Sequence, residues 1–234
     1  MLEELKLVLD RYSIPFSEEN AEKLVKFVEL MKKYNESHNI TAITEDFDVI
    51  YKHLLDSLLP INKIENNLKL IDVGCGAGFP SVPLAIVNEK LDMTALDSVN
   101  KKIEFVKIVK NTLNLHNLTP IHSRIEEFAL NPKYRESFDI VLSRAVAPLN
   151  IILEYSAPLL KNGGYVFAYK GSNYMEELNN CKSALKILDC EVEEVFEYDI
   201  DEIGAKRYVL KIKKKSSLSN KYPRKQNKPR LQPL

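Results

Sequence analysis

The feature that most constrains this chain is an apolar, β-branched run that ends in an acid and leads directly into three closely spaced glycines. Residues 68–80 read LKLIDVGCGAGFP. The run predicts a buried parallel strand, and the glycines predict a tight turn where a ligand can approach the backbone. A dinucleotide fingerprint would space its glycines G-x-G-x-x-G to seat a pyrophosphate. Here the spacing is G-x-G-x-G, and a carboxylate two residues before the first glycine favours a cationic group over a pyrophosphate.

This pattern resembles motif I of the Rossmann-like methyltransferases that use S-adenosylmethionine (SAM), whose amino acid moiety carries such a cation. The residues that it proposes as donor contacts are Asp72, Gly74, Gly76 and Gly78. A glycine-rich strand-to-helix turn without a ligand is the alternative.

Strand and helix patterns alternate after Leu68, which predicts a parallel sheet with crossover helices. The predicted strands are 68–73, 92–97, 119–122, 138–143 and 165–169, with two last ones near 191–198 and 207–213. The predicted helices are about 83–87, 100–114, 125–129, 149–160 and 174–188, and residues 161–164 are expected to form a helix-ending turn. The expected fold class is therefore α/β, a Rossmann-like SAM-dependent methyltransferase fold whose seven-stranded, mostly parallel sheet ends in an antiparallel edge hairpin.

The N-terminal part shows helical spacing and no strand pattern. Helices are expected over 2–12, 17–36 and 47–59, with Ser17 and Asp46 as N-caps of the second and third, and with Pro60 ending the third. The predicted division is a helical cap over 1–66, a methyltransferase core over 67–213 and a basic, flexible tail over 214–234.

Charge is distributed unevenly along the chain. Its 33 Lys and Arg balance 33 Asp and Glu, yet residues 211–234 hold nine of the cations and no acid. Such asymmetry predicts an arm that meets phosphate, and a disordered, solubilising tail is the alternative. The predicted RNA-binding residues are Lys221, Arg224, Lys225, Lys228 and Arg230.

Several function classes are disfavoured. No apolar run approaches the roughly 20 residues of a membrane span, and the N-terminus lacks the apolar centre of a signal peptide. Three cysteines without metal-type spacing favour a reducing cytoplasm and give no support to a metal site. We expect a cytoplasmic protein without a metal cofactor.

Ligands of open α/β sheets bind beyond the carboxyl ends of the strands. Asp97 ends the second strand, where it can accept hydrogen bonds from ribose hydroxyls or simply cap a helix. Residues 124–127, after the third strand, can meet the adenine edge or form surface charge.

The fourth strand leads to Arg144 without the Asn/Asp-Pro-Pro-aromatic motif of exocyclic-amine methyltransferases or the cysteine that C5 chemistry needs. The arginine can bind an RNA phosphate, a guanine edge or the donor's carboxylate, or form a structural ion pair. An acceptor such as guanine N7 fits, because its lone pair needs no deprotonation and proximity and orientation then suffice. Arg144 is the one catalytic candidate, and no general base is expected.

The whole set of motifs resembles the RsmG (GidB) family of bacterial small-subunit rRNA methyltransferases. The matching segments are 34–35, 39–43, HLLDSL at 53–58, 72–83, 96–98, 123–127, 143–145 and 170–171. The resemblance implies N7 methylation of one guanosine in the decoding-region loop of 16S rRNA. It also implies SAM contacts from Gly74, Phe79, Ile125, Glu126 and Arg144. Ser81 and Asn227 stand where many members have glycine.

The resemblance leaves some points open. His53 and Asp56 share a helix face and either shape the RNA or donor pocket or stabilise the helix. The expected partner is 16S rRNA or the small ribosomal subunit, and a monomer is expected. The alternative functions are a methyltransferase of a protein or small molecule, and a non-catalytic SAM- or RNA-binding ribosome assembly factor.

Overall fold

A computed structural model describes residues 1–234 of the chain. The residues group into two compact units, each discontinuous in sequence. The first unit holds Met1–Leu68 and Cys75–His122, and the second holds Lys69–Gly74 and Ser123–Leu234. The predicted division into cap, core and tail stays a prediction.

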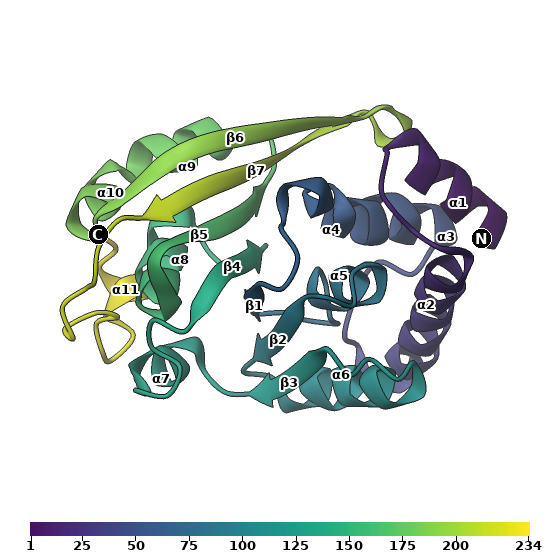
Figure 1. Cartoon of the computed structure of the whole chain (residues 1–234), viewed down its shortest axis with the longest axis horizontal. Coiled ribbons are helices and arrows are strands. Elements are labelled where there is room, and N and C mark those ends of the chain that lie inside the picture. Colours follow the sequence, from purple (N-terminus) through teal and green to yellow (C-terminus); the bar gives the residue numbers. More distant parts are fainter. The chain divides into compact units, whose positions relative to one another are not determined.

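The strands form a seven-stranded sheet in the order β3-β2-β1-β4-β5-β7-β6. Their bounds are β1 Lys69–Val73, β2 Asp92–Asp97, β3 Leu118–His122, β4 Phe138–Arg144, β5 Leu160–Lys170, β6 Cys190–Ile200 and β7 Ala205–Lys214. β2 and β3 pair in parallel, as do β1 with β4 and β4 with β5, whereas β7 pairs antiparallel with both β5 and β6. The predicted fold class is confirmed, including the antiparallel hairpin at the sheet edge (Figure 1).

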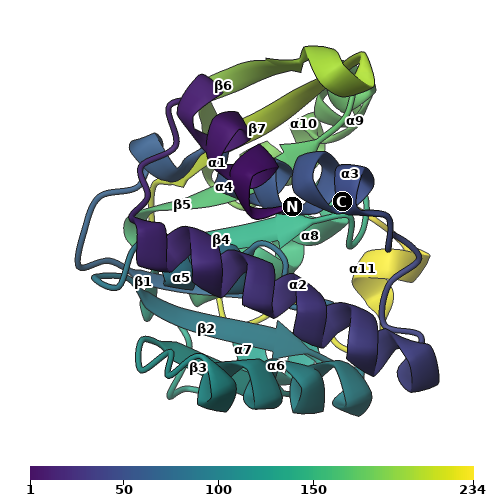
Figure 2. The same cartoon turned by 90° about the vertical axis from the view of Figure 1, so that its right-hand side faces the viewer.

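The first unit holds the N-terminal helices, which Figure 2 shows with the long α2 running near α6. Its helices are α1 Leu2–Arg11, α2 Glu18–His38, α3 Asp46–Val49, α4 Asp56–Leu58, α5 Ser81–Val87 and α6 Asn100–Thr112, with a short 3₁₀ turn at Ile61–Lys63. Ser17 caps α2 as predicted, through a capping box in which its hydroxyl accepts from the Asn20 backbone N–H at 3.1 Å. The Asn20 side chain also donates to the Ile86 carbonyl at 2.8 Å and so ties α2 to α5.

The third predicted helix differs from the structure. Between α3 and α4 the chain forms a π-helical turn, η1, at Ile50–Leu55. Glu45 occupies the N-cap position, and Asp46, the predicted cap, is instead the first residue inside the helix. Hydrophobic spacing predicts that a segment is helical but does not reveal a local widening, which depends on what the segment packs against.

The second unit holds the remaining helices and the edge hairpin. Its helices are α7 Ile125–Leu130, α8 Leu149–Ser156, α9 Tyr174–Asn180, α10 Lys182–Ile187 and α11 Lys228–Leu231, with 3₁₀ turns at Ala157–Leu159 and Asp201–Ile203. The single helix expected over 174–188 is two helices that meet at Cys181. The turn expected over 161–164 lies inside β5, where the register with β4 jumps from Phe138↔Leu160 to Ile140↔Tyr165.

The C-terminal residues make defined contacts within the second unit. Arg135 donates to the carbonyls of Leu218 and Tyr222 at 3.0 and 2.8 Å. Lys214 is fully buried at the end of β7 and pairs with Glu136 at 2.7 Å. The flexibility expected of residues 214–234 concerns motion and stays a prediction.

Candidate functional site

The glycine loop of the first unit is tied to the end of β2 by backbone hydrogen bonds. The Cys75 N–H donates to the Leu96 carbonyl at 3.0 Å, and the Gly76 N–H donates to Asp97 Oδ2 at 2.9 Å. The other oxygen, Asp97 Oδ1, accepts from the Val99 N–H at 2.8 Å, ahead of α6. A carboxylate offers about four acceptor positions, so Asp97 anchors the loop and retains capacity for the ribose hydroxyls predicted for it.

The loop leaves open space at Gly76. This residue has φ +59°, and a Cβ placed on it would meet no atom within 4 Å. The left-handed conformation disfavours any side chain there, and the open space suits a ligand that passes close to the backbone. The Gly78 carbonyl, further along, accepts from the Val82 N–H at 2.7 Å and so connects the loop to the first turn of α5.

The Phe79 side chain is a packing element of the first unit. It is buried, and its ring centroid lies 4.4 Å from that of His53 and 4.9 Å from that of Phe27. His53 in turn contacts the Thr41 hydroxyl through Nε2 at 3.1 Å. His53 therefore joins the motif at 39–43 to the end of the glycine loop, and the donor contact predicted for Phe79 stays a prediction.

The second unit brings together Asp72, Gly74 and Arg144 near the carboxyl ends of β1 and β4. Asp72 is fully buried and lies opposite Leu142 of β4. Gly74 has φ +76°, and a Cβ there would lie 2.7 Å from Val146 Cγ2. Because only glycine permits this approach, the segment that follows Arg144 packs directly against the start of the glycine loop.

Lys170 fixes that segment from the neighbouring strand. Its Nζ donates to the Ala147 carbonyl at 3.3 Å and to Glu177 Oε2 at 2.6 Å, and the same carboxylate oxygen accepts from the Leu149 N–H at 2.9 Å. The sequence singles out residues 170–171 only through the family resemblance. Glu177, the partner of Lys170, lies seven residues later on the following helix, and no local pattern connects it to the end of β4.

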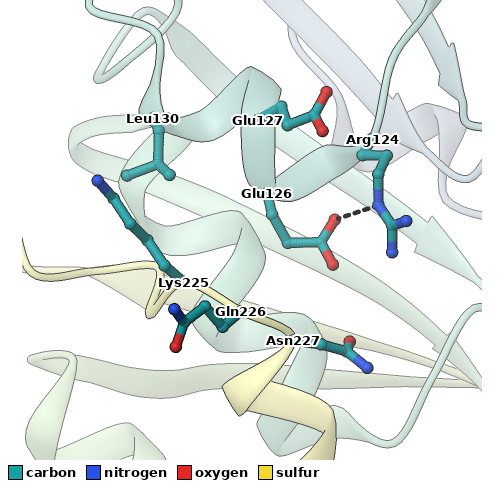
Figure 3. A pocket seen from close by; sticks show the side chains of 7 residues that line it. All are labelled: Arg124, Glu126, Glu127, Leu130, Lys225, Gln226 and Asn227. Atoms are coloured by element: carbon teal, nitrogen blue, oxygen red, sulfur yellow. Dashed lines mark ion pairs between the residues drawn. The ribbon is translucent and has the colours of Figure 1, made fainter.

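Ile125 and Glu126 open α7, at one side of a cavity of about 410 Å³. The Glu126 carboxylate is 16% exposed, lies 3.9 Å from Arg124 Nε, and accepts a hydrogen bond from the Tyr155 hydroxyl at 3.1 Å. Figure 3 shows the cavity between α7 and the C-terminal segment. The lining residues are Arg124, Glu126, Glu127, Leu130, Lys225, Gln226 and Asn227.

The five predicted RNA-binding residues divide into two groups. Lys221, Lys225, Lys228 and Arg230 are exposed. Arg224 is partly buried and makes three contacts with Glu154, from its backbone N–H and Nε to Oε1 at 2.9 and 2.8 Å, and from Nη2 to Oε2 at 2.7 Å. Arg224 thus serves as an anchor in this structure, and the RNA-binding roles stay predictions.

The residue types that bind metals do not cluster, and the cysteines are buried. No group of three or more His, Cys, Asp or Glu residues is arranged to hold a metal ion. All three cysteines are buried and free of disulfides, and burial raises the pKa of both Cys181 and Cys190 to about 12. These two thiols therefore stay protonated near neutral pH, where a nucleophile would need to be a thiolate.

No helix combines the length and apolarity needed to cross a membrane.

Comparisons with known proteins show which family the sequence of this chain matches. The family model described as rRNA small subunit methyltransferase G matches residues 20–205. Among curated proteins, the Ribosomal RNA small subunit methyltransferase G of Acetivibrio thermocellus is 41% identical over 95% of this chain and 92% of its own. Its namesake in Thermoanaerobacter pseudethanolicus is 44% identical over 92% of this chain and 90% of its own.

Solved structures show the same fold at low identity. TYW2 of M. jannaschii in complex with AdoMet is 15% identical, with a TM-score of 0.56 over 74% of this chain and 79% of that one. A SAM dependent methyltransferase from Aquifex aeolicus is 18% identical, with a TM-score of 0.54 over 71% of this chain and 93% of that one.

Proposed function

The chain belongs to the rRNA small subunit methyltransferase G family, and we propose that it transfers a methyl group from SAM to N7 of a guanosine in 16S rRNA. The observation that carries the proposal is the 41% identity to a curated family member over 95% of the chain. The glycine loop adds independent support, since its anchoring carboxylate and open backbone suit a nucleoside ligand. A monomer in the cytoplasm, where rRNA and reduced thiols occur, is part of the same proposal.

Bound SAM supplies an electrophilic methyl group on a sulfonium. Three acids of the chain suit the three parts of this donor. Asp72 would hold the cationic amino acid end and Asp97 the ribose hydroxyls, while Ile125 and Glu126 would meet the adenine edge. Gly74 and Gly76 would allow the donor to lie against the backbone.

The acceptor is inferred from what the neighbouring residues can do. Guanine N7 carries a lone pair and no proton, so its attack on a methyl group needs no general base. Catalysis would then consist of holding base and donor in line, and of stabilising the charge that shifts onto the base. Arg144 is the residue at the end of β4 with the chemistry to bind the guanine acceptor edge, a phosphate or the donor's carboxylate.

RNA affinity would come mainly from the exposed cations after residue 220. Lys221, Lys225, Lys228 and Arg230 carry four positive charges that can neutralise phosphates. Arg224 would contribute indirectly, because its contact with Glu154 holds the segment in place.

The experiment that tests the proposal is methyl transfer from labelled SAM to small-subunit rRNA. The RNA is supplied both naked and as subunits from cells that lack this gene, and the modified base is identified by nuclease digestion and mass spectrometry. We expect N7-methylguanine at a single site, and an Arg144→Ala variant that folds but loses transfer. SAM binding without labelled RNA would overturn the substrate, and absence of SAM binding would overturn the methyltransferase activity itself.

A further inference from the structure

Tyr155 is a fully buried tyrosine of α8 whose hydroxyl reaches a predicted donor-binding residue. The hydroxyl donates to Glu126 Oε1 at 3.1 Å. Burial, followed by the nearby Glu126 charge, raises the pKa of Tyr155 to about 12. The tyrosine is therefore a permanent donor at neutral pH, and it fixes one oxygen of a carboxylate that is otherwise held only by a long contact to Arg124 at 3.9 Å.

The residue before it, Glu154, anchors the C-terminal segment. Glu154 is fully buried, and Arg224 meets it through both its backbone and its guanidinium. Arg224 Nη2 also donates to the Gln232 carbonyl at 2.7 Å, which closes residues 224–232 into a loop. Arg230, within this loop, belongs to α11, which packs against α8, and its positive charge partly offsets the rise in the pKa of Tyr155. Two adjacent residues of α8 thus make these contacts: Glu154 holds the C-terminal segment, and Tyr155 holds Glu126.

The cavity lies at the same place. Residues Lys225–Asn227 line it on one side, and Arg124, Glu126 and Glu127 on the other, so both walls belong to elements that α8 contacts (Figure 3). Gln226 and Asn227 have φ values of +59° and +57°, two successive left-handed residues that carry side chains. Such a turn persists only where its surroundings maintain it, and the Arg224 anchor directly precedes it.

We propose that Tyr155 is a positioning residue that couples the C-terminal segment, residues 222–232, to the carboxylate of Glu126. The inference rests on the proposed function, since it takes Glu126 to contact the donor. The docked segment packs α11, which carries Arg230, against α8, and the Tyr155 hydroxyl of α8 sets the orientation of Glu126. Because coupling between two binding events is reciprocal, a donor that binds Glu126 also stabilises the docked segment.

The test is Tyr155→Phe in the full chain, which removes one oxygen atom and preserves the ring. Its matched control is Tyr198→Phe in β6, which removes another buried hydroxyl, one without a hydrogen-bond partner. We expect Tyr155→Phe to raise the SAM dissociation constant about fivefold by isothermal titration calorimetry, a change of roughly 1 kcal/mol. KM for SAM rises and kcat is unchanged, while Tyr198→Phe leaves both unaltered.

The second readout is tryptic cleavage at Lys225, which precedes Gln226, with and without SAM. SAM is expected to slow cleavage in the wild type and in Tyr198→Phe, but not in Tyr155→Phe. Arg230→Gln, an exposed change that leaves the buried core intact, is expected to remove the protection as well.

The outcomes separate the two proposals. An unchanged SAM affinity in Tyr155→Phe overturns the positioning role while the proposed function stands. A raised dissociation constant with undiminished protection of the segment overturns the coupling. If Tyr155→Phe does not fold, Arg230→Gln decides the coupling alone. A wild-type chain that does not bind SAM overturns both proposals.

Discussion

The glycine loop and the C-terminal segment are both expected to meet ligands, but they are held in place by different means. Residues 75–78 are tied by backbone N–H groups to Leu96 and Asp97, whose positions in the chain lie about 20 residues away. The C-terminal segment is held mainly by side chains, above all by the ion pair between Arg224 and Glu154, whose carboxylate has no exposed surface, and also by Arg135 at the Tyr222 carbonyl. A substitution should therefore act in the loop through the backbone conformation, and in the segment through the burial of charge.

The largest effect is expected when the anchor of the segment is broken. Arg224→Met leaves the Glu154 carboxylate buried without its partner, and removing one member of a buried pair typically costs about 3–5 kcal/mol. We expect a lower free energy of unfolding by urea denaturation and faster tryptic cleavage after residue 220.

Two further variants sharpen this expectation. Lys225→Met removes an exposed charge from the next residue and should change the free energy of unfolding by less than about 0.5 kcal/mol. The double change Glu154→Met with Arg224→Met removes both charges and should recover most of the loss, since apolar replacement of a whole buried pair is often neutral. An Arg224→Met chain as stable as the wild type would refute the anchor.

The second largest effect is expected from alanine at Gly76 in the glycine loop, with alanine at Gly204 as the matched control. Gly76 and Gly204 have nearly the same φ, +59° and +57°, and a Cβ would meet no atom within 4 Å at either. Alanine at either position should therefore cost a similar amount of folding free energy, about 1–2 kcal/mol. Gly76→Ala should in addition weaken SAM binding at least tenfold by calorimetry, because its methyl group would occupy the space expected for the donor. Equal SAM affinity in the two variants would remove Gly76 from the donor site.

A smaller effect concerns the cations of the segment. Replacing Lys225 and Lys228 together by glutamine should weaken rRNA binding and lower the slope of log affinity against log salt, by about 0.7 for each lost contact with single-stranded phosphate. The free energy of unfolding should not change, because both side chains are exposed. Filter binding at several salt concentrations measures the slope. A slope equal to that of the wild type would make these residues solubilising charges only.

The same contrast explains what the sequence could predict. Motif spacing located the glycine loop and Asp97, and strand alternation predicted the sheet and its edge hairpin, because both signals lie in neighbouring residues. Pairings over long distances along the chain left no such signal. Nothing near Glu154 in the sequence indicates Arg224, and nothing near Tyr155 indicates Glu126. The sequence therefore predicts Arg224 only as an RNA contact and does not distinguish Tyr155 from other apolar positions. The π-helical turn at Ile50–Leu55 was missed for a related reason, since packing and not composition determines it.

The smallest effect is expected at alkaline pH, where exposed tyrosines ionise but the buried ones stay protonated. The pKa of Tyr155 is raised from its ordinary value of 10 to about 12, as is that of Tyr198. Because the pKa is higher in the folded than in the unfolded chain, the protonated tyrosine contributes fully to the free energy of unfolding below pH 10. This contribution is lost as the pH rises towards 12. Each tyrosine should therefore cost the wild type roughly 0.8 kcal/mol at pH 10.5 relative to pH 8. Urea denaturation at the two pH values measures the loss, which Tyr155→Phe should reduce by one tyrosine's share. If that variant loses as much stability between pH 8 and 10.5 as the wild type, the pKa of Tyr155 is not raised in the folded chain.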